Sequence, residues 1–318
     1  MRILANDGID KAGKVKLESQ GFIVDTNRIE QADLPSKLHD YDVLLVRSAT
    51  KVNKEILDAG SNLKLVGRAG VGLDNVDLVH AAEKNIKVIN TPSASSTSVA
   101  ELVFAHLFSV CRMLQVSNRI MPAEGNAKFN ELKKLAANGT ELKSKTLGIL
   151  GFGRIGQEVA RMAIGLGMNV VAFDPYLEKA DIKLSIHPAI SSDKYSFTIN
   201  TVSKEEVLKQ SDFITLHVPG GKEAVIGKNE IALMKDGSGI INCARGGVVN
   251  EQDLVEALKS GKLAYAGVDV FEKEPPVYED ILKLDNVSLS AHIGASTKEA
   301  QQRIGEEMSD LIISFFKS

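Results

Sequence analysis

The feature that most constrains this chain is the glycine-rich segment GFGRIG at Gly151–Gly156, which directly follows the apolar run TLGIL at Thr146–Leu150. A strand, a glycine-rich turn and a helix, in that order, form the phosphate-binding element of dinucleotide-binding folds. A helix is expected after the glycines because apolar residues of 155–166 recur at helical spacing. Glycines with this spacing also occur in ordinary turns, so the order of the elements carries the prediction.

Each glycine has a physical role in such a loop. Gly151 permits the tight turn, Gly153 lets the backbone approach a pyrophosphate, and Gly156 lets the helix pack closely on the strand. The N-terminus of the helix then presents free N–H groups and a positive dipole to the phosphates. The segment therefore predicts a bound dinucleotide.

The identity of the dinucleotide follows from Asp174, which ends the next apolar run about twenty residues after the glycines. A carboxylate there accepts hydrogen bonds from both ribose hydroxyls and repels a 2′-phosphate, so we expect NAD and not NADP. The alternative is that Asp174 is only a strand-end turn residue before Pro175.

The rest of the chain alternates short apolar runs with helix-prone segments, which predicts two doubly wound α/β domains with parallel sheets. At 318 residues the chain is too long for one ordinary core. Between the two series lies a long helical stretch with few charges, Thr97–Val116, and then a charged and less regular segment, Met121–Gly139. We expect a surface loop at Leu184–Ile199 and a final helix at Lys298–Phe316. The predicted strands are Arg2–Ala5, Phe22–Asp25, Asp42–Arg47, Lys64–Arg68, Lys87–Ile89, Thr146–Leu150, Asn169–Asp174, Asp212–His217, Gly239–Asn242, Tyr265–Asp269 and Val287–Ser290.

Composition excludes several classes of function. The chain is 44% hydrophobic and 25% charged with a net charge of −3, so neither a nucleic acid nor a membrane surface is an expected partner. No run of 18 apolar residues predicts a membrane span. The two cysteines, Cys111 and Cys243, supply neither a disulfide framework nor a zinc site, and we expect no metal. A cytoplasmic protein with reduced thiols is the expectation.

Five long motifs give the chain a family resemblance that runs nearly from end to end. They are VRSATKV (46–52), GRAGVGLDNVD (67–77), INCARGGVVNEQDLVEAL (241–258), AGVDVFEKEPP (266–276) and LSAHIGASTKEAQ (289–301). The chain resembles the D-isomer-specific 2-hydroxyacid dehydrogenases, and HIGASTKEAQ with NCARGG resembles their phosphoglycerate dehydrogenase branch. The resemblance implies a Rossmann NAD-binding domain, 97–292, inserted in a flavodoxin-like substrate-binding domain made of 1–96 and 293–318.

The oxidation of a 2-hydroxy acid needs a group that holds the carboxylate and a base for the hydroxyl proton. Arg245 is the candidate for the first role, because a planar guanidinium binds a carboxylate with two parallel hydrogen bonds. His292 is the candidate base, because imidazole exchanges protons near neutral pH. Glu274 would orient the imidazole, and in the family the matching positions carry these roles. The bland alternatives are a surface arginine, a solvated carboxylate and a strand-end cap.

The resemblance also implies further contacts. Apart from the glycines and Asp174, the implied cofactor-binding residues are Arg154, Ile155, Val218, Pro219, Cys243, Ala244, Arg245, Asp269, His292, Gly294 and Ala295. Arg47 and Arg68 match positions near a substrate phosphate, and the backbone of Ala69, Gly70 and Val71 would bind the substrate carboxylate along with Arg245. The loop GGKEAVIG after Pro219 departs from the family, because it lacks the threonine that usually contacts the cofactor phosphates.

The implied reaction is the oxidation of 3-phospho-D-glycerate to 3-phosphohydroxypyruvate by NAD, the first step of phosphorylated serine biosynthesis. The alternatives are a glyoxylate or hydroxypyruvate reductase and a nucleotide-sensing corepressor of the same fold. A homodimer paired through Thr97–Val116 is expected. Long relatives continue into regulatory domains that this sequence lacks, so we expect the short form and no regulation by serine.

Overall fold

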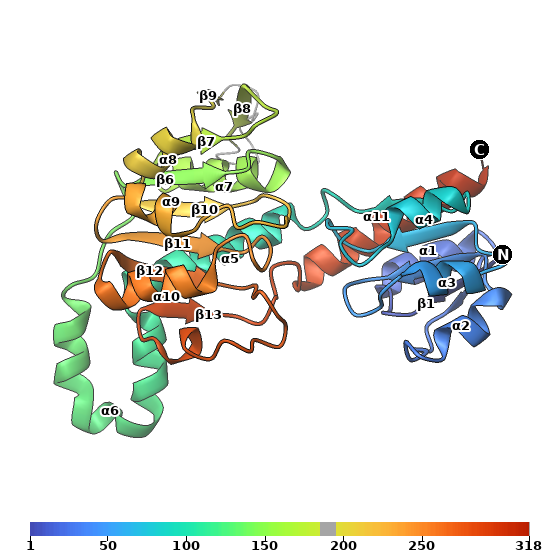
Figure 1. Cartoon of the computed structure of the whole chain (residues 1–318), viewed down its shortest axis with the longest axis horizontal. Helices are drawn as coiled ribbons and strands as arrows, with labels where there is room; N and C mark the ends of the chain where they lie inside the picture. The colour runs from blue at the N-terminus through green and yellow to red at the C-terminus, as the bar shows by residue number, and fades with distance from the viewer. Residues whose placement is uncertain (185–194, 318) are drawn as a thin grey trace. The chain divides into compact units, whose positions relative to one another are not determined.

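The computed structural model describes residues 1–184 and 195–317, and the chain forms two compact units (Figure 1). The first unit combines Met1–Ser96 with Ala295–Ser318, and the second is Thr97–Gly294. The sequence prediction had placed 293 and 294 in the first unit. They lie in the second because the amides of Ile293 and Gly294 donate hydrogen bonds to Asp269.

The first unit is built on a five-stranded parallel sheet in the order β2-β1-β3-β4-β5, the order of flavodoxin-like folds. Its strands are β1 (Arg2–Ala5), β2 (Ile23–Asp25), β3 (Val43–Val46), β4 (Leu65–Arg68) and β5 (Lys87–Asn90). Its helices are α1 (Lys11–Ser19), α2 (Leu34–Lys37), η1 (Leu38–Asp40), α3 (Lys54–Ala59), α4 (Leu78–Glu83) and α11 (Lys298–Lys317).

Both faces of this sheet are covered, which is why β3 reads as four consecutive buried apolar residues. One face carries Leu17 of α1 together with Met308 and Ile312 of α11. The two helices approach so closely that a Cβ atom on Gly13 would lie 2.6 Å from the carbonyl oxygen of Gly305. The C-terminal helix thus returns to the sheet of the first unit, as the family resemblance implied.

The second unit is built on a six-stranded parallel sheet in the order β13-β12-β11-β10-β6-β7. Thr201 adds a parallel bridge to Ala172 at the edge of β7. Counted from β6, the arrangement is the Rossmann order 3-2-1-4-5-6 with the third strand reduced to that bridge and β13 added. The strands are β6 (Thr146–Leu150), β7 (Asn169–Phe173), β8 (Lys179–Lys183), β9 (Ser196–Asn200), β10 (Phe213–Leu216), β11 (Ser238–Asn242), β12 (Leu263–Val268) and β13 (Val287–Leu289). The helices are α5 (Ser96–Cys111), α6 (Leu114–Ala136), α7 (Arg154–Gly165), α8 (Lys204–Gln210), α9 (Lys228–Leu233), α10 (Glu251–Ser260) and η3 (Ile281–Lys283). The predicted fold class is confirmed.

Two local predictions were wrong. The segment Met121–Gly139 is not irregular, because most of it belongs to the long helix α6, which contains Pro122. The stretch Leu184–Ile199 is not simply a loop, since Ser196–Asn200 pairs as β9 with β8 in an antiparallel ribbon. Residues 185–194 of that stretch lie outside the described residues.

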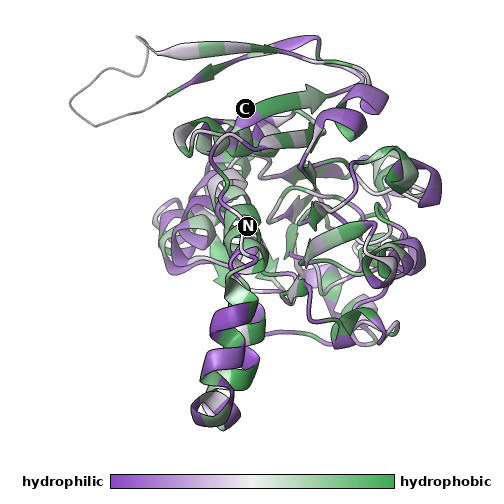
Figure 2. Cartoon of the chain, turned by 90° about the vertical axis from the view of Figure 1, so that its left-hand side faces the viewer, coloured by the Kyte–Doolittle hydropathy of each residue, from purple (hydrophilic) through white to green (hydrophobic). Residues whose placement is uncertain are grey.

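The distribution of hydropathy follows these layers, with hydrophobic residues along the strands of the sheets (Figure 2). Among the described residues, no single helix is long and apolar enough to cross a membrane. Only α5 and α6 taken together, with a bend of 64° between them, meet that criterion.

Candidate active site

The glycine-rich loop follows β6 at the point where the strand order of the second unit reverses, between β6 and β10. Gly151 has φ +93°, and a Cβ atom there would lie 2.6 Å from the carbonyl oxygen of His217. A Cβ atom on Gly156 would collide with the backbone of Gly151. At Gly153, by contrast, no described residue other than the glycine and its two chain neighbours has an atom within 4 Å of the Cβ position. The packing of the protein therefore requires two of the glycines, and the third leaves space for an outside group.

The first turn of α7 faces that space with its amides uncapped. Its N-cap is Gly153, which supplies no side-chain hydrogen bond, and Arg154 and Ile155 are the first helical residues. Free N–H groups and the helix dipole at this position favour an anion. The loop therefore fits the pyrophosphate of a dinucleotide.

Asp174 follows β7 and lies beside this loop. Its Oδ2 accepts a hydrogen bond from the amide of Phe152 at 2.7 Å, and its Oδ1 accepts one from the amide of Tyr176 at 2.9 Å. Asp174 is thus a turn residue, which was the alternative to a cofactor-binding role. The same two hydrogen bonds hold its carboxylate next to the glycine-rich loop, so the two roles are compatible. An ionised carboxylate has about four acceptor sites, so capacity remains for ribose hydroxyls.

We expect Asp174→Ala to weaken NAD binding and to narrow the preference for NAD over NADP by about tenfold or more, which corresponds to 1.4 kcal/mol. The variant removes both the acceptor and the charge that repels a 2′-phosphate. Asp174→Asn is the matched control, because it removes the charge and keeps an acceptor oxygen. Binding constants for both cofactors decide the matter, and an unchanged NADP-to-NAD ratio in both variants would assign the preference to another residue.

The three predicted catalytic residues lie at one edge of the second unit's sheet. Arg245, Glu274 and His292 follow β11, β12 and β13, which are successive parallel neighbours, so the carboxyl ends of their strands meet at the same edge. The Nδ1 atom of His292 lies 2.8 Å from Oε2 of Glu274. The other carboxylate oxygen of Glu274 accepts a hydrogen bond from the amide of Phe271 at 3.3 Å.

This pair has the geometry of an oriented general base. A carboxylate can only accept a hydrogen bond, so Nδ1 of His292 carries the proton and Nε2 is left as the exchanging atom. Within the part of the chain that the structure describes, Nε2 has no hydrogen-bond partner. Both side chains are about 40% exposed (43% and 40%), so the pair adds little to stability and its orientation is better explained by chemistry.

Arg245 lies in a tightly constrained loop. The side chain of Asn242 bridges the turn, accepting from the amide of Ala244 and donating to the carbonyl of Arg245. The guanidinium donates to the carbonyl of Ala244 at 2.6 Å. A Cβ atom on Gly246 would collide with the backbone of Phe271, so only glycine fits beside the chain that leads to Glu274.

Four of the residues implied to bind the cofactor also lie near this edge. Cys243 and Ala244 are buried directly after β11, and Val218 and Pro219 follow β10. Burial raises the pKa of the Cys243 thiol well above its usual value, and the neighbouring charge of Asp269 adds to the effect. Cys243 is therefore a packing residue and not a nucleophile.

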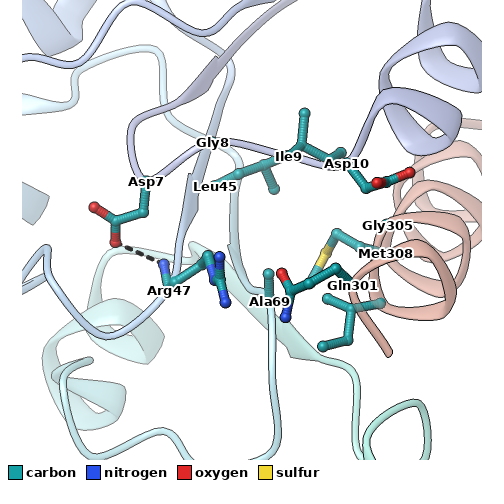
Figure 3. A pocket seen from close by; sticks show the side chains of 11 residues that line it. Asp7, Gly8, Ile9, Asp10, Leu45, Arg47, Ala69, Gln301, Gly305 and Met308 are labelled. Carbon is teal, nitrogen blue, oxygen red and sulfur yellow. Dashed lines mark hydrogen bonds between the residues drawn. The ribbon is translucent and has the colours of Figure 1, made fainter. Parts of the chain in front are cut away.

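Arg47 and Arg68 belong to the first unit, and they also lie at the carboxyl edge of its sheet. Arg47 directly follows β3 and Arg68 ends β4, its neighbour. A cavity of about 280 Å³ opens there, where the strand order reverses between β1 and β3. In Figure 3 the guanidinium of Arg47 points into this cavity, toward Ala69 and Gln301, while its backbone amide donates to Asp7 at 2.7 Å. Arg68 does not line the cavity; its guanidinium lies against Gly70, where a Cβ atom would collide with it.

The backbone after β4 is arranged to offer amides. The carbonyl of Gly70 accepts from the amide of Thr91, and the carbonyl of Val71 accepts from the side chain of Asn90. Within the described residues, the amides of Gly70 and Val71 donate to no protein acceptor. Two such amides on a glycine-containing turn form a binding site for an anion. Ala295, the remaining predicted contact, begins the C-terminal segment of this unit.

The sequence prediction missed other residues of this cavity: Asp7, Asp10 and Gln301. In the sequence, Asp10 can be identified only as a possible N-cap of α1. In the structure it has this role, because its side chain accepts a hydrogen bond from the amide of Ala12 at 2.8 Å. Gln301 ends the motif HIGASTKEAQ, yet no spacing rule connects it with Arg47, more than 250 residues earlier. Residues such as Gln301 can be identified only once the topology is known, because α11 must return to the sheet of the first unit before Gln301 comes near Arg47.

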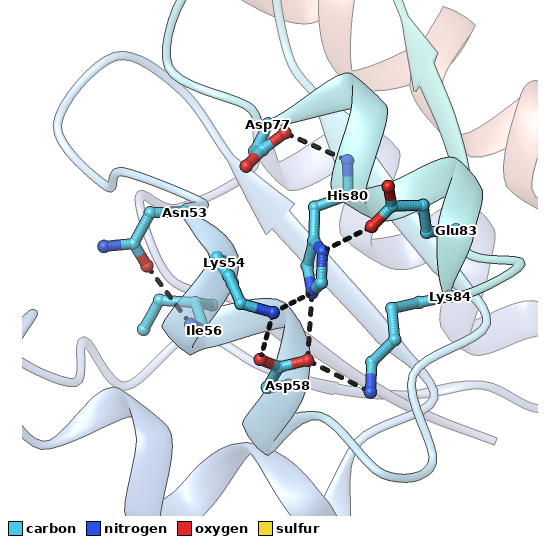
Figure 4. Close-up of polar contacts among 8 residues, drawn as sticks. All are labelled: Asn53, Lys54, Ile56, Asp58, Asp77, His80, Glu83 and Lys84. Atoms are coloured by element: carbon cyan, nitrogen blue, oxygen red, sulfur yellow. Dashed lines mark hydrogen bonds and ion pairs between the residues drawn. The ribbon is translucent and has the colours of Figure 1, made fainter.

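A second cluster of ionisable groups joins α3 to α4 in the first unit (Figure 4). His80 is 11% exposed, and its ring nitrogens contact Asp58 at 2.9 Å and Glu83 at 3.0 Å. Lys54 and Lys84 pair with Asp58, and Asp77 caps the helix by accepting from the amide of His80. The hydrogen bond to Asp58 raises the pKa of His80, with Glu83 adding to the effect while burial and Lys54 oppose it.

This shift predicts how stability depends on pH. The folded-state pKa lies above the ordinary value of 6.5, so the contribution of His80 is fully present below that pH and is lost as the pH rises through the folded-state value. We expect the unfolding midpoint of His80→Gln to lie below that of wild type at pH 6 and to approach it at pH 8.5. His39→Gln, which removes an exposed histidine of the same unit, is the control. A gap that stays constant over this range would show that packing and not protonation sets the contribution of His80.

Comparison with known proteins agrees with this geometry. The family model described as "D-isomer specific 2-hydroxyacid dehydrogenase, NAD binding domain" matches residues 104–294. The chain is 43% identical over 317 residues to a hydroxypyruvate reductase of Thermotoga maritima, covering 98% of this chain and 97% of that protein. It is 42% identical over 314 residues to a D-3-phosphoglycerate dehydrogenase of Methanocaldococcus jannaschii, covering 98% of this chain and 57% of that protein. The chain thus spans little more than half the length of such phosphoglycerate dehydrogenases.

Solved structures show the same likeness. A glyoxylate reductase from Paecilomyes thermophila is 27% identical with a TM-score of 0.83, covering 100% of this chain and 95% of that one. An NAD⁺-bound 3-phosphoglycerate dehydrogenase of Entamoeba histolytica is 26% identical with a TM-score of 0.79, covering 100% and 96%. The predicted cofactor, NAD, is confirmed by the family of the matched domain. The chain belongs to the D-isomer specific 2-hydroxyacid dehydrogenase family, and its second unit contains the NAD-binding domain of that family.

Proposed function

We propose that this dehydrogenase oxidises 3-phospho-D-glycerate to 3-phosphohydroxypyruvate, the first step of phosphorylated serine biosynthesis. The observation that carries the choice of substrate is the cavity of the first unit into which Arg47 points. The nearby amides of Gly70 and Val71, which donate to no acceptor in the described part of the chain, supply a second group of anion-binding donors. A substrate with anionic groups at both ends matches donors of this kind. The phosphoglycerate dehydrogenase relatives support the same choice.

The proposed mechanism assigns one task to each side chain. The bound NAD supplies the acceptor for the hydride that leaves C2 of the substrate. Nε2 of His292 takes the hydroxyl proton, while Glu274 holds Nδ1 and so keeps the ring oriented. Arg245 binds the substrate carboxylate through the parallel donors of its guanidinium. Asp174 holds the ribose end of the cofactor, and the α7 N-terminus holds its phosphates.

If Arg47 binds the substrate phosphate, Arg47→Ala should raise KM for 3-phosphoglycerate about tenfold, the effect of losing a charge-assisted hydrogen bond. The KM of the variant should also depend less on salt. Arg28→Ala, which removes an exposed arginine of the same unit, is the matched control. Steady-state kinetics with 3-phosphoglycerate and unphosphorylated D-glycerate provide the measurement. Equal losses on both substrates would place Arg47 in folding or in carboxylate binding.

A second candidate function is the reduction of hydroxypyruvate. It is favoured by the Thermotoga maritima relative, which matches this chain over 97% of its own length. Comparing NADH-dependent reduction of hydroxypyruvate with that of 3-phosphohydroxypyruvate separates the two candidates. A higher kcat/KM for the unphosphorylated acid would overturn our first choice. The corepressor alternative loses support, because the relatives above are named as enzymes.

We also propose that two copies of the chain pair through α5 and α6. Large apolar side chains are exposed along these helices: Phe108, Leu114, Met121 and Phe129 are 42%, 47%, 44% and 57% exposed. Exposed apolar side chains that lie on neighbouring helices favour the association of two protein surfaces. Sedimentation of the full chain is the test, and a single species of 34.3 kDa would exclude the dimer.

A cytoplasmic location is also part of the proposal. Both cysteines, Cys111 and Cys243, are buried and form no disulfide, which suits a reducing compartment.

A further inference from the structure

Asp269 accepts hydrogen bonds from the backbone of the loop that carries His292. Three consecutive amides donate to it: His292 to its carbonyl oxygen at 2.7 Å, Ile293 to Oδ1 at 2.8 Å and Gly294 to Oδ2 at 3.0 Å. His292 itself has φ +53°, in the left-handed region that non-glycine residues seldom occupy. Surrounding hydrogen bonds must maintain such a conformation, and here Asp269 supplies them.

Asp269 is in turn bound to a chain of side chains that the proposed mechanism does not use. Ser290 donates its hydroxyl proton to Oδ1 of Asp269 at 2.6 Å. Nε2 of His106 lies 3.0 Å from the oxygen of Ser290, and Nδ1 of His106 lies 2.9 Å from the oxygen of Ser288. His106 comes from α5, is 3% exposed, and packs against Gly267 of β12.

The direction of every hydrogen bond in this chain follows from its carboxylate end. Asp269 can only accept, so the single proton of the Ser290 hydroxyl goes to it. Ser290 must then accept from Nε2–H of His106. Burial lowers the pKa of His106, which keeps the ring neutral, so Nδ1 accepts from the hydroxyl of Ser288. One tautomer satisfies all four groups.

A relay of this kind has more than a packing role at its Asp269 end. Hydrogen bonds in a chain polarise one another, and a buried network fixes its members in one arrangement. Without Ser290, the amide of Ile293 would be the only donor to Oδ1 of Asp269 among the described residues. The carboxylate would then be freer to rotate away from the loop. The carbonyl of Gly294, held by the hydroxyl of Ser98 at 2.7 Å, would remain the loop's other fixed point.

We propose that His106 and Ser290 are positioning residues that lock Asp269, and through it the backbone of 292–294, in the orientation that His292 needs for proton transfer. This inference rests on the proposed function, because it assumes that His292 is the base. The alternative is a buried histidine whose hydrogen-bonding groups are merely satisfied. That alternative predicts a loss of stability and no selective loss of turnover.

Ser290→Ala is the central variant, and Ser290→Thr is its conservative partner. Ser290 lines a cavity of about 540 Å³, so the added methyl group has room and the hydroxyl is restored. Ser288→Ala is the matched control, because it removes the same group from the other ring nitrogen of His106 without touching Asp269. His106→Met breaks the relay from α5, and His106→Gln keeps an N–H donor toward Ser290.

The variants are compared by steady-state kinetics and by hydrogen exchange at the amides of Ile293 and Gly294 in the full chain. We expect Ser290→Ala to lower kcat about tenfold with little change in the substrate KM, and to speed exchange at both amides about tenfold. Ser290→Thr should restore both values, and Ser288→Ala should stay within about twofold of wild type. His106→Met should resemble Ser290→Ala in both kcat and exchange. The double variant that combines these two substitutions should have a kcat no lower than that of either single variant.

Two different failures can be told apart. If the wild-type chain oxidises or reduces none of the candidate acids, the proposed function is wrong, while the exchange measurement still tests the relay. If wild type is active and Ser290→Ala keeps normal turnover and normal exchange, the relay is overturned. Equal effects of Ser288→Ala and Ser290→Ala would also overturn it, because they would reflect burial alone.

Discussion

The variant His292→Asn is expected to lower turnover by about two to four orders of magnitude, the usual contribution of a general base. Asparagine resembles the imidazole in shape and can still donate to Glu274, but it cannot take the hydroxyl proton. The atom lost is Nε2, which has no protein partner among the described residues. Because both side chains of the His292–Glu274 pair are about 40% exposed, loss of the pair should change the unfolding midpoint little.

Cofactor binding provides the control for this variant. The glycine-rich loop follows β6 and Asp174 follows β7, and both are far in sequence from the loop that carries His292. The Kd for NAD should therefore stay close to that of wild type. Glu274→Gln should lose less turnover than His292→Asn, since it weakens the orientation of the base but leaves the base in place. Near-normal turnover of His292→Asn would remove the residue from the mechanism, whatever the behaviour of Glu274→Gln.

The parallel strands of both units could be predicted from the sequence, because parallel strands that are covered on both faces are apolar along most of their length. β3 and β10 consist entirely of buried residues, and their predicted positions were correct to within one residue. Arg245, Glu274 and His292 were proposed from the chemistry and the family motifs, and the structure brings them to one edge because the carboxyl ends of parallel strands share an edge.

The helix α6 and the ribbon of β8 and β9 could not be predicted for the opposite reason. Most residues of α6 are exposed, so no apolar stripe of helical period marks it, and Pro122 is a residue that usually ends a helix. In β8 and β9 only Ile182 is buried, which leaves no alternation of the kind that signals a strand. Their formation depends on pairing with each other.

The hydrogen-bonded chain of Ser288, His106, Ser290 and Asp269 could not be predicted from the sequence either. The hydrogen bonds of His106 join residues 182 and 184 positions apart, across a helix and the last strand of the sheet. An isolated histidine in an apolar helix is most simply explained as a packed core residue. Only the sheet order, which places β13 beside β12, brings Ser288, Ser290 and Asp269 within reach of α5. Long-range polar contacts of this kind require the fold to be known first.

The variant Arg245→Ala should lower kcat/KM by about two to four orders of magnitude. Two charge-assisted hydrogen bonds to the substrate carboxylate are lost, each worth about 1.5–3 kcal/mol, and each 1.4 kcal/mol is a factor of ten. Arg245→Lys should lose less, because it keeps the charge but offers a compact ammonium in place of the planar pair of donors.

The control for Arg245 must separate substrate binding from the loop's own structure, because the guanidinium also donates to the carbonyl of Ala244. Arg119→Lys changes an arginine of the same unit that likewise donates to a backbone carbonyl, that of Leu284, and should leave kcat/KM unchanged. Wild type and both variants are then assayed with the substrate and with an analogue whose carboxylate is replaced by an amide. If Arg245 binds the carboxylate, wild type should prefer the acid to the amide, and Arg245→Ala should have lost most of that preference. Equal losses on the acid and the amide would instead assign Arg245 to holding its loop, and the carboxylate would have to be bound by other donors.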